Sequence, residues 1–222
     1  MVIIASHLRR DAWAEKDTLG ARFNYNLSGL VTYMYRRYII ATIFPDLHLR
    51  VLPFNRCITS LDDLASSEFK RRVSKNFHVN SIRAGSDPSP TQAHEIAMFL
   101  DGRWYSLLPR DSVLFSIQHD PVDSLDPEIL LNRLLRPFLG VRCPRTDKRL
   151  QYVCGDAGFQ ELERRVYSGE AQVSFCLRSV TVEQIMGVAD LNRLLPPKVK
   201  KLHPVCVNKI ICSRPLVSIL SL

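Results

Sequence analysis

The chain has 222 residues, of which 46% are hydrophobic and 23% charged, and its formal net charge is +8. These values are typical of a soluble globular protein with one full core, or with a core and a smaller satellite. The distribution of apolar residues excludes a helical membrane protein. The longest apolar run, residues 38–44, is far shorter than the roughly 20 residues of a membrane span.

The charged residues and the cysteines indicate where the protein is located and which ligands its sequence favours. Arg9, Arg10 and Asp11 interrupt the first apolar run, so no signal peptide is predicted and a cytoplasmic location follows by default. Six cysteines without a C-x-x-C pair agree with a reducing compartment and give no zinc spacing. The basic residues form small separated groups beside acids, as on solvated helix faces, so charge alone is a weak argument for nucleic-acid binding.

The first half of the chain predicts short strands, one helix and a hairpin. Residues 11–19 can be helical, and strands are expected over 38–44 and 49–58, where Pro53 favours an edge or a bend. A helix is expected over 64–77, capped by Asp62, Asp63 and Ser66. Residues 83–92 are a predicted loop. The Asp101-Gly102 pair then predicts a hairpin within residues 94–109.

The second half predicts alternating helices and strands. The expected helices are 124–140, with Pro127 in its first turn and Gly140 at its end, 158–169 and 181–195. The expected strands are 150–155, 171–178 and 205–213. The predicted fold class is therefore α+β (mixed α/β). We expect a single domain over 1–222, with a subdivision into 1–110 and 111–222 as the alternative.

Three polar stretches are candidates for chemistry. Residues 3–14 follow a strand-like run with Ser6, His7, Arg9 and Arg10, as at a phosphate-holding turn, although a charged helix start gives the same pattern. Asp120, Asp123, Asp126 and Glu128 lie near His119, but the helix entry at Pro127 explains Ser124 and Asp126 better as caps. Residues 194–204 form a stiff basic turn, suited to an anion or to solvent. No Walker loop, nucleophile elbow or HExxH motif is present.

Longer patterns in the sequence resemble a known family. The stretches "SLDPEILLNRLLRPFLG", "QYVCGDAGFQELERRVYSGEAQVSFCL" and "TVEQIMGVADLNRLLPPK" resemble the C-terminal region of the family called domain of unknown function 1015. Upstream, "ATIFPDLHLRVLPFNR" and "FLDGRWYSL" resemble its strand pair and its hairpin. The resemblance covers roughly residues 2–212. Because family members are about twice this length, the N-terminal half is expected to be missing.

The resemblance also implies where a phosphate site would lie. The family signature Ile-Ala-Asp-Gly-His-His-Arg-Tyr-Glu-Thr-Ala looks like a phosphate-handling loop of the ParB/sulfiredoxin-like superfamily, which includes chromosome-partitioning proteins and free-serine kinases. Placed on residues 4–14, it matches at Ile4, Ala5, Arg10 and Ala14, while Ser6 and His7 replace its Asp-Gly. The family's Pro-Thr-His-Arg corresponds to residues 53–56, and its Pro-Pro-Lys ends at Lys198.

These substitutions predict a divergent, truncated family member that keeps the fold and lacks catalysis. It would retain at most anion or nucleotide binding, with ATP or ADP as the ligand and no metal. The alternatives are an ATP-dependent phosphotransferase acting on a free amino acid such as serine, and a ParB-like DNA-binding protein. The expected partner is the missing half or a second copy of the chain, with no membrane. The candidate anion contacts are Ser6, His7, Arg9, Arg10, Asn55, Arg56 and Lys198.

Overall fold

The computed structural model describes residues 2–4, 38–44, 49–196, 198, 200–204 and 217–221. They fall into two compact units, one formed by Met1–Arg50 with His203–Leu222 and the other by Val51–Leu202. The expected helix 11–19 and strand 205–213 lie outside the described residues. The expectation of a single domain stays a prediction.

The first unit contains a three-stranded antiparallel sheet. Its strands are β1 (Val2–Ile4), β2 (Tyr38–Phe44) and β10 (Val217–Ser221), in the order β1-β2-β10. The strand predicted over 38–44 is therefore confirmed, and it is the central strand of this sheet.

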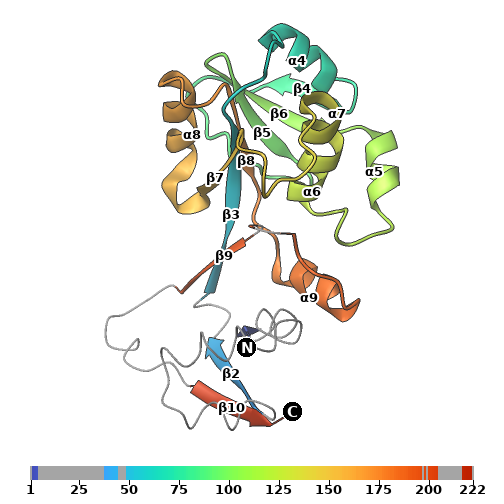
Figure 1. The fold of residues 1–222 in the computed structure, drawn as a ribbon, viewed down its shortest axis with the longest axis vertical. Helices are drawn as coiled ribbons and strands as arrows, with labels where there is room; N and C mark the ends of the chain where they lie inside the picture. Colours follow the sequence, from blue (N-terminus) through green and yellow to red (C-terminus); the bar gives the residue numbers. More distant parts are fainter. Residues whose placement is uncertain are drawn as a thin grey trace. The chain divides into compact units, whose positions relative to one another are not determined.

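The second unit is built on a larger antiparallel sheet (Figure 1). Six strands follow the order β4-β6-β5-β8-β3-β7, and β9 also pairs with β3. The strands are β3 (Leu49–Ile58), β4 (Phe77–Ser81), β5 (Ile96–Leu100), β6 (Arg103–Pro109), β7 (Leu150–Cys154), β8 (Val173–Leu177) and β9 (Lys200–Pro204). The mixed α+β class is thereby confirmed.

Helices cover both faces of this sheet, and β5 and β8 are buried throughout. One face carries α4 (Ser66–Val73), α5 (Asp111–Ile117), α6 (Asp126–Leu130), a π-helical turn at Leu131–Leu135 and α7 (Arg136–Leu139). The other carries α8 (Gly158–Tyr167), after a 3-10 turn at Gly155–Ala157. A further helix, α9 (Val182–Asp190), follows β8. Among the described residues no helix is long and apolar enough to cross a membrane.

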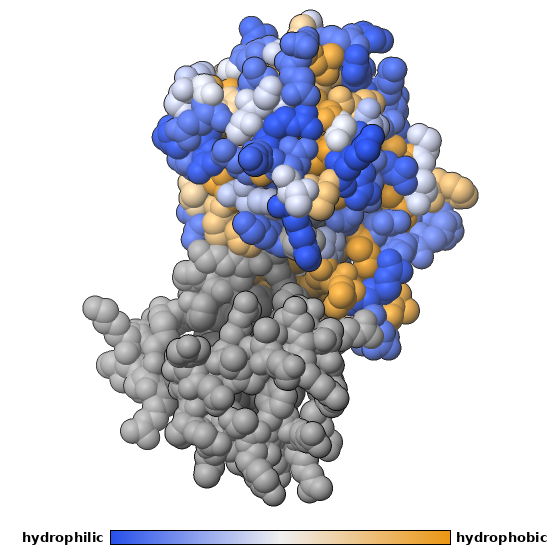
Figure 2. Space-filling model, viewed as in Figure 1, coloured by the Kyte–Doolittle hydropathy of each residue, from blue (hydrophilic) through white to orange (hydrophobic). Residues whose placement is uncertain are grey.

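The central core lies on the face covered by α4 to α7. Its largest fully buried side chains include Phe69, Phe77, Phe175, Ile129 and Leu130, while Phe99 packs with Trp104 in the smaller core under α8. On the face shown in Figure 2, hydrophilic residues cover most of the coloured surface, and hydrophobic residues show in scattered patches.

The predicted hairpin and the long second-half helix follow local rules. Leu100 pairs with Arg103 across a two-residue turn in which Asp101 and Gly102 both have positive φ, the type I′ geometry that Asp-Gly favours. The segment predicted as helix 124–140 is helical from Asp126 to Leu139 and ends at Gly140 in the left-handed conformation.

The predicted helix caps were wrong. Both α4 and α6 begin after apolar residues, Ala65 and Leu125, without a side-chain cap. The hydroxyl of Ser66 instead donates to Asp101 at 2.9 Å, and that of Ser124 donates to the Pro121 carbonyl at 3.0 Å. These two serines therefore form a tertiary contact and a turn contact, in place of the helix-capping hydrogen bonds expected from the sequence.

Candidate anion-binding site

Strand β3 positions two of the candidate residues on opposite faces of the sheet. Arg56 pairs with Tyr152 of β7 on one side and with Phe175 of β8 on the other, so β3 is an interior strand there. Pro53, which lacks an amide hydrogen, lies just before Phe54, where the pairing of β3 with β7 begins. Because side chains alternate along a strand, Asn55 and Arg56 point to opposite sides.

Asn55 has a structural role at the point where β3 and β8 separate. The last registered pair between these strands is Arg56 with Phe175. One residue further, the side-chain Oδ1 of Asn55 accepts a hydrogen bond from the Leu177 amide at 3.0 Å, and Asn55 is only 2% exposed. The side chain thus replaces a backbone acceptor that the diverging strands no longer supply.

Arg56 is a buried cation held by carbonyl groups. Its Nη1 donates to the carbonyls of Phe54 at 2.5 Å and Asn55 at 3.5 Å, and its Nη2 donates to the carbonyl of Lys198 at 3.0 Å. Arg56 is only 5% exposed, yet no carboxylate of the described residues forms an ion pair with it. Burial lowers the pKa of Arg56 to about 10, against the charges of Tyr152 and Glu128, which raise it.

Tyr152 brings a second cation to the same place. Its ring centre lies 4.3 Å from the guanidinium carbon of Arg56 and 4.7 Å from Nζ of the exposed Lys198. The aromatic face stabilises both cations electrostatically. The Tyr152 hydroxyl donates to the Pro144 carbonyl at 3.2 Å, which fixes the ring, and burial raises its pKa.

A small cavity adjoins these residues, and Glu128 is the one acid in its wall. Its volume is about 20 Å³, room for a water molecule. Burial raises the pKa of Glu128, so its negative charge is disfavoured, while a hydrogen bond from Asn132 at 3.2 Å and the charge of Arg136 act in the opposite sense. The cavity is lined by Arg56, Pro127, Glu128, Leu131, Leu135, Pro144, Leu150, Tyr152 and Pro196.

The site therefore has a local excess of positive charge with one solvent-facing donor. The buried guanidinium supplies the field, and the exposed ammonium of Lys198 is the group that an incoming anion can contact directly. We define Arg56, Tyr152 and Lys198 as the tyrosine-centred cation site. The adjoining cavity, of about 20 Å³, is too small to enclose a phosphate.

The predicted contacts are distributed unevenly over the structure. Arg56 and Lys198, 142 positions apart, lie together, whereas Asn55 faces the other side of the sheet. Ser6, His7, Arg9 and Arg10 lie outside the described residues. Sequence reasoning missed Tyr152, which no local pattern marks, since only the pairing of β3 with β7 brings it to Arg56. Glu128 was noted only as part of the acidic segment near His119, and the structure places it beside Arg56 and Tyr152 instead.

The acidic segment before α6 forms no metal site in the part of the chain that the structure describes, where no group of three His, Cys, Asp or Glu side chains could hold an ion. Asp120 pairs with Arg193 at 3.0 Å, and the carboxylate of Asp126 lies 3.2 Å from Nδ1 of His94. These contacts connect the segment to the residues that follow α9 and to the loop before β5.

The chain is similar to several solved structures and matches no curated protein. A free serine kinase in complex with AMP is 10% identical, with a TM-score of 0.42, covering 74% of this chain and 59% of that one. A mutant free serine kinase in complex with ADP is 12% identical, with a TM-score of 0.41 and the same coverage. A conserved hypothetical protein from Pyrococcus furiosus is 10% identical, with a TM-score of 0.41, covering 80% and 62%. The chain spans about three fifths of the length of these structures.

A family model matches part of the sequence. Residues 32–128 match the family described as Protein of unknown function (DUF1015). The match runs from before β2 to α6, and it includes Arg56 and the Asp101-Gly102 hairpin. It supports, for this segment, the family resemblance that the sequence motifs indicated.

Proposed function

We propose that this protein binds a small phosphorylated anion at the tyrosine-centred cation site, with ADP or ATP as the first ligands to test and without catalysing phosphoryl transfer. One observation carries the proposal: two cations share one aromatic ring, and no carboxylate of the described residues pairs with either. An anion of the ligand would supply the missing negative charge.

The resemblance to a phosphate-handling superfamily directs the choice of ligand. In this account Lys198 contacts the phosphate, and Arg56 holds the turn before β9 through the Lys198 carbonyl. Ser6, His7, Arg9 and Arg10 remain candidate contacts from the opening stretch. Asn55 holds β3 to β8 in this account rather than contacting the ligand.

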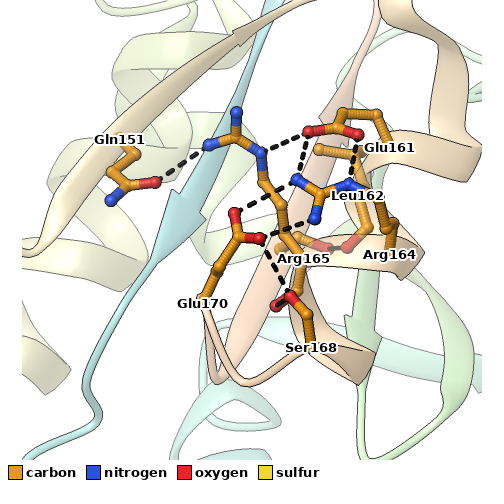
Figure 3. A network of polar contacts seen from close by, with 8 residues as sticks. Gln151, Glu161, Leu162, Arg164, Arg165, Ser168 and Glu170 are labelled. Atoms are coloured by element: carbon orange, nitrogen blue, oxygen red, sulfur yellow. Dashed lines mark hydrogen bonds and ion pairs between the residues drawn. The ribbon is translucent and has the colours of Figure 1, made fainter.

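The ion pairs of the helices favour a small anion over DNA. In α8, Arg164 binds Glu161 and Glu170 at 2.7 Å and 2.6 Å, and Arg165 binds Glu161 at 2.7 Å (Figure 3). Arg71 and Arg72 of α4 bind Glu68 in the same way. Glu161 and Glu170 offset the two arginines of α8, so this group offers little net charge to a phosphate backbone, and both arginines of α4 are already paired with Glu68.

Calorimetric titration of the full chain tests the proposal. ADP, ATP and phosphoserine are injected to millimolar concentration, and saturable heat with at least one of them is expected. Absence of heat with all three refutes binding. A companion assay for transfer of phosphate from ATP to serine is expected to be negative, and turnover that Lys198→Gln abolishes would replace this proposal with the phosphotransferase alternative.

A further inference from the structure

A larger cleft lies where β3 and β8 separate, beyond the Arg56–Phe175 pair. Its volume is about 580 Å³, within the range of pockets that bind small molecules. We call it the β3–β8 cleft. It is lined by Val51, Pro53, Asn55, Ser89, Pro90, Gly155, Gly158, Phe159, Cys176, Leu177, Arg178, Ser179, Val180, Thr181 and Val182.

The walls of the cleft are mostly apolar and are shaped by backbone packing. Gly155 lies so close to Pro53 that a Cβ at this position would be 2.7 Å from the proline Cδ. Gly158 has a φ of +71°, a backbone conformation that residues with a side chain rarely adopt. The next residue, Phe159, contributes its ring to the wall. These contacts restrain the backbone of the wall, and Phe159 gives the wall an aromatic surface.

The polar groups of the cleft favour a negatively charged ligand. No Asp or Glu lines it, and its one charged residue is the exposed Arg178. Within the described part of the chain, Arg178 has neither an ion pair nor a side-chain hydrogen bond, in contrast to Arg164 and Arg165 in Figure 3.

The adjacent helix start does not supply the anion contact. Thr181 and Gln184 form a reciprocal capping box at the beginning of α9, with bonds of 2.9 Å and 3.2 Å. These bonds already satisfy amides of the first turn. The positive group available to a ligand is therefore the guanidinium of Arg178, with the hydroxyl of Ser179 as a further polar group in the wall. Ser89 is already hydrogen-bonded to Asp87 through its hydroxyl and its amide.

We propose that the β3–β8 cleft binds a small organic anion with a ring-sized apolar body. The apolar body packs against the lining that includes Phe159, and the carboxylate, sulfonate or phosphate of the ligand pairs with Arg178. The inference is independent of the tyrosine-centred cation site, because Asn55 and Arg56 direct their side chains to opposite faces of the sheet.

The test uses two fluorescent probes that differ in charge, 8-anilinonaphthalene-1-sulfonate and the uncharged N-phenyl-1-naphthylamine, titrated into the full chain. Arg178→Gln is expected to weaken binding of the sulfonate about tenfold and to leave the affinity for the neutral probe unchanged. The matched control is Arg103→Gln, at an exposed arginine of β6 outside the cleft, which is expected to change neither affinity.

A blocking variant checks the location. Ser89→Trp places a large ring at the exposed wall of the cleft and is expected to weaken both probes. Arg178→Lys is expected to recover part of the sulfonate affinity. The inference is overturned if the wild-type chain shows no saturable binding, if Arg178→Gln and Arg103→Gln bind the sulfonate equally, or if Ser89→Trp leaves both affinities unchanged.

Discussion

Arg56 and Tyr152 are direct partners across β3 and β7, and the guanidinium carbon of Arg56 lies 4.3 Å from the centre of the tyrosine ring. Antiparallel pairing places both side chains on the same face, so the contact follows from strand register. The same ring lies 4.7 Å from the ammonium of Lys198, which comes from the turn after α9. Tyr152 thereby connects a buried strand to the residue that would contact an anion.

Removing the Tyr152 ring should cost more stability than removing its hydroxyl. Tyr152→Phe loses only the hydrogen bond to Pro144, so its free energy of unfolding is expected to fall by about 1 kcal/mol. Tyr152→Leu also loses the interaction with both cations, a further loss of about 1–2 kcal/mol. Urea denaturation measures both variants, and equal losses would show that the ring–cation contacts are energetically neutral.

Asn55 should be required for the connection between β3 and β8. Asn55→Ala leaves the buried Leu177 amide without its acceptor, so the free energy of unfolding is expected to fall by about 1–3 kcal/mol. Asn80→Ala, at an exposed position of β4, is the matched control and is expected to change it by less than about 0.5 kcal/mol. Similar values for the two variants in urea denaturation would contradict the assigned role.

Two glycine-to-alanine substitutions should act in opposite directions. Gly102 has a φ of +72° in the hairpin turn, so Gly102→Ala is expected to destabilise the protein by about 1 kcal/mol. Gly187 lies within α9 with open space at its Cβ position, so Gly187→Ala is expected to stabilise it by about 0.5–1 kcal/mol. Thermal unfolding of both variants gives the signs, and stabilisation by Gly102→Ala would refute the turn geometry.

The arginine–glutamate network of α8 should stabilise the fold near neutral pH, and this stabilisation should be lost in acid. Hydrogen bonds from Arg164 and Arg165 lower the pKa of Glu161 to about 2, from an ordinary value of 4.5. A carboxyl whose pKa is lower in the folded state stabilises the fold above pH 4.5, and this contribution is lost as the pH falls towards 2. Glu161→Gln should therefore reduce the loss of stability over this interval.

The control for the pH experiment is Asp63→Asn, which alters an exposed carboxylate that has no ion pair among the described residues. It should leave the acid dependence close to that of the wild type. Chemical denaturation at a series of pH values compares the three proteins. Parallel curves for all three would contradict the effect assigned to Glu161.

Local sequence signals predicted the elements that depend on local chemistry. The Asp101-Gly102 turn, the proline and glycine at the ends of the 126–139 helical segment, and the alternating order of the second half all appear in the structure. Each depends on conformational preferences within a few residues.

Features that depend on long-range pairing could not be predicted in this way. Pro53 suggested an edge or a bend, yet β3 becomes an interior strand three residues later, because β7 and β8, about 100 residues further along the chain, pair with it. The resemblance pointed to Arg56 and Lys198, but Tyr152, which brings them together, has no motif of its own.

The affinity of the Lys198→Gln variant for ADP tests the central claim most directly. Titration calorimetry of the full chain compares the wild type, Lys198→Gln and Lys75→Gln, the last at an exposed lysine in the turn after α4. We predict that Lys198→Gln weakens ADP binding about three- to tenfold and that Lys75→Gln leaves it unchanged. Equal affinities for all three proteins, or no measurable binding to the wild type, would contradict an anion site at Arg56, Tyr152 and Lys198.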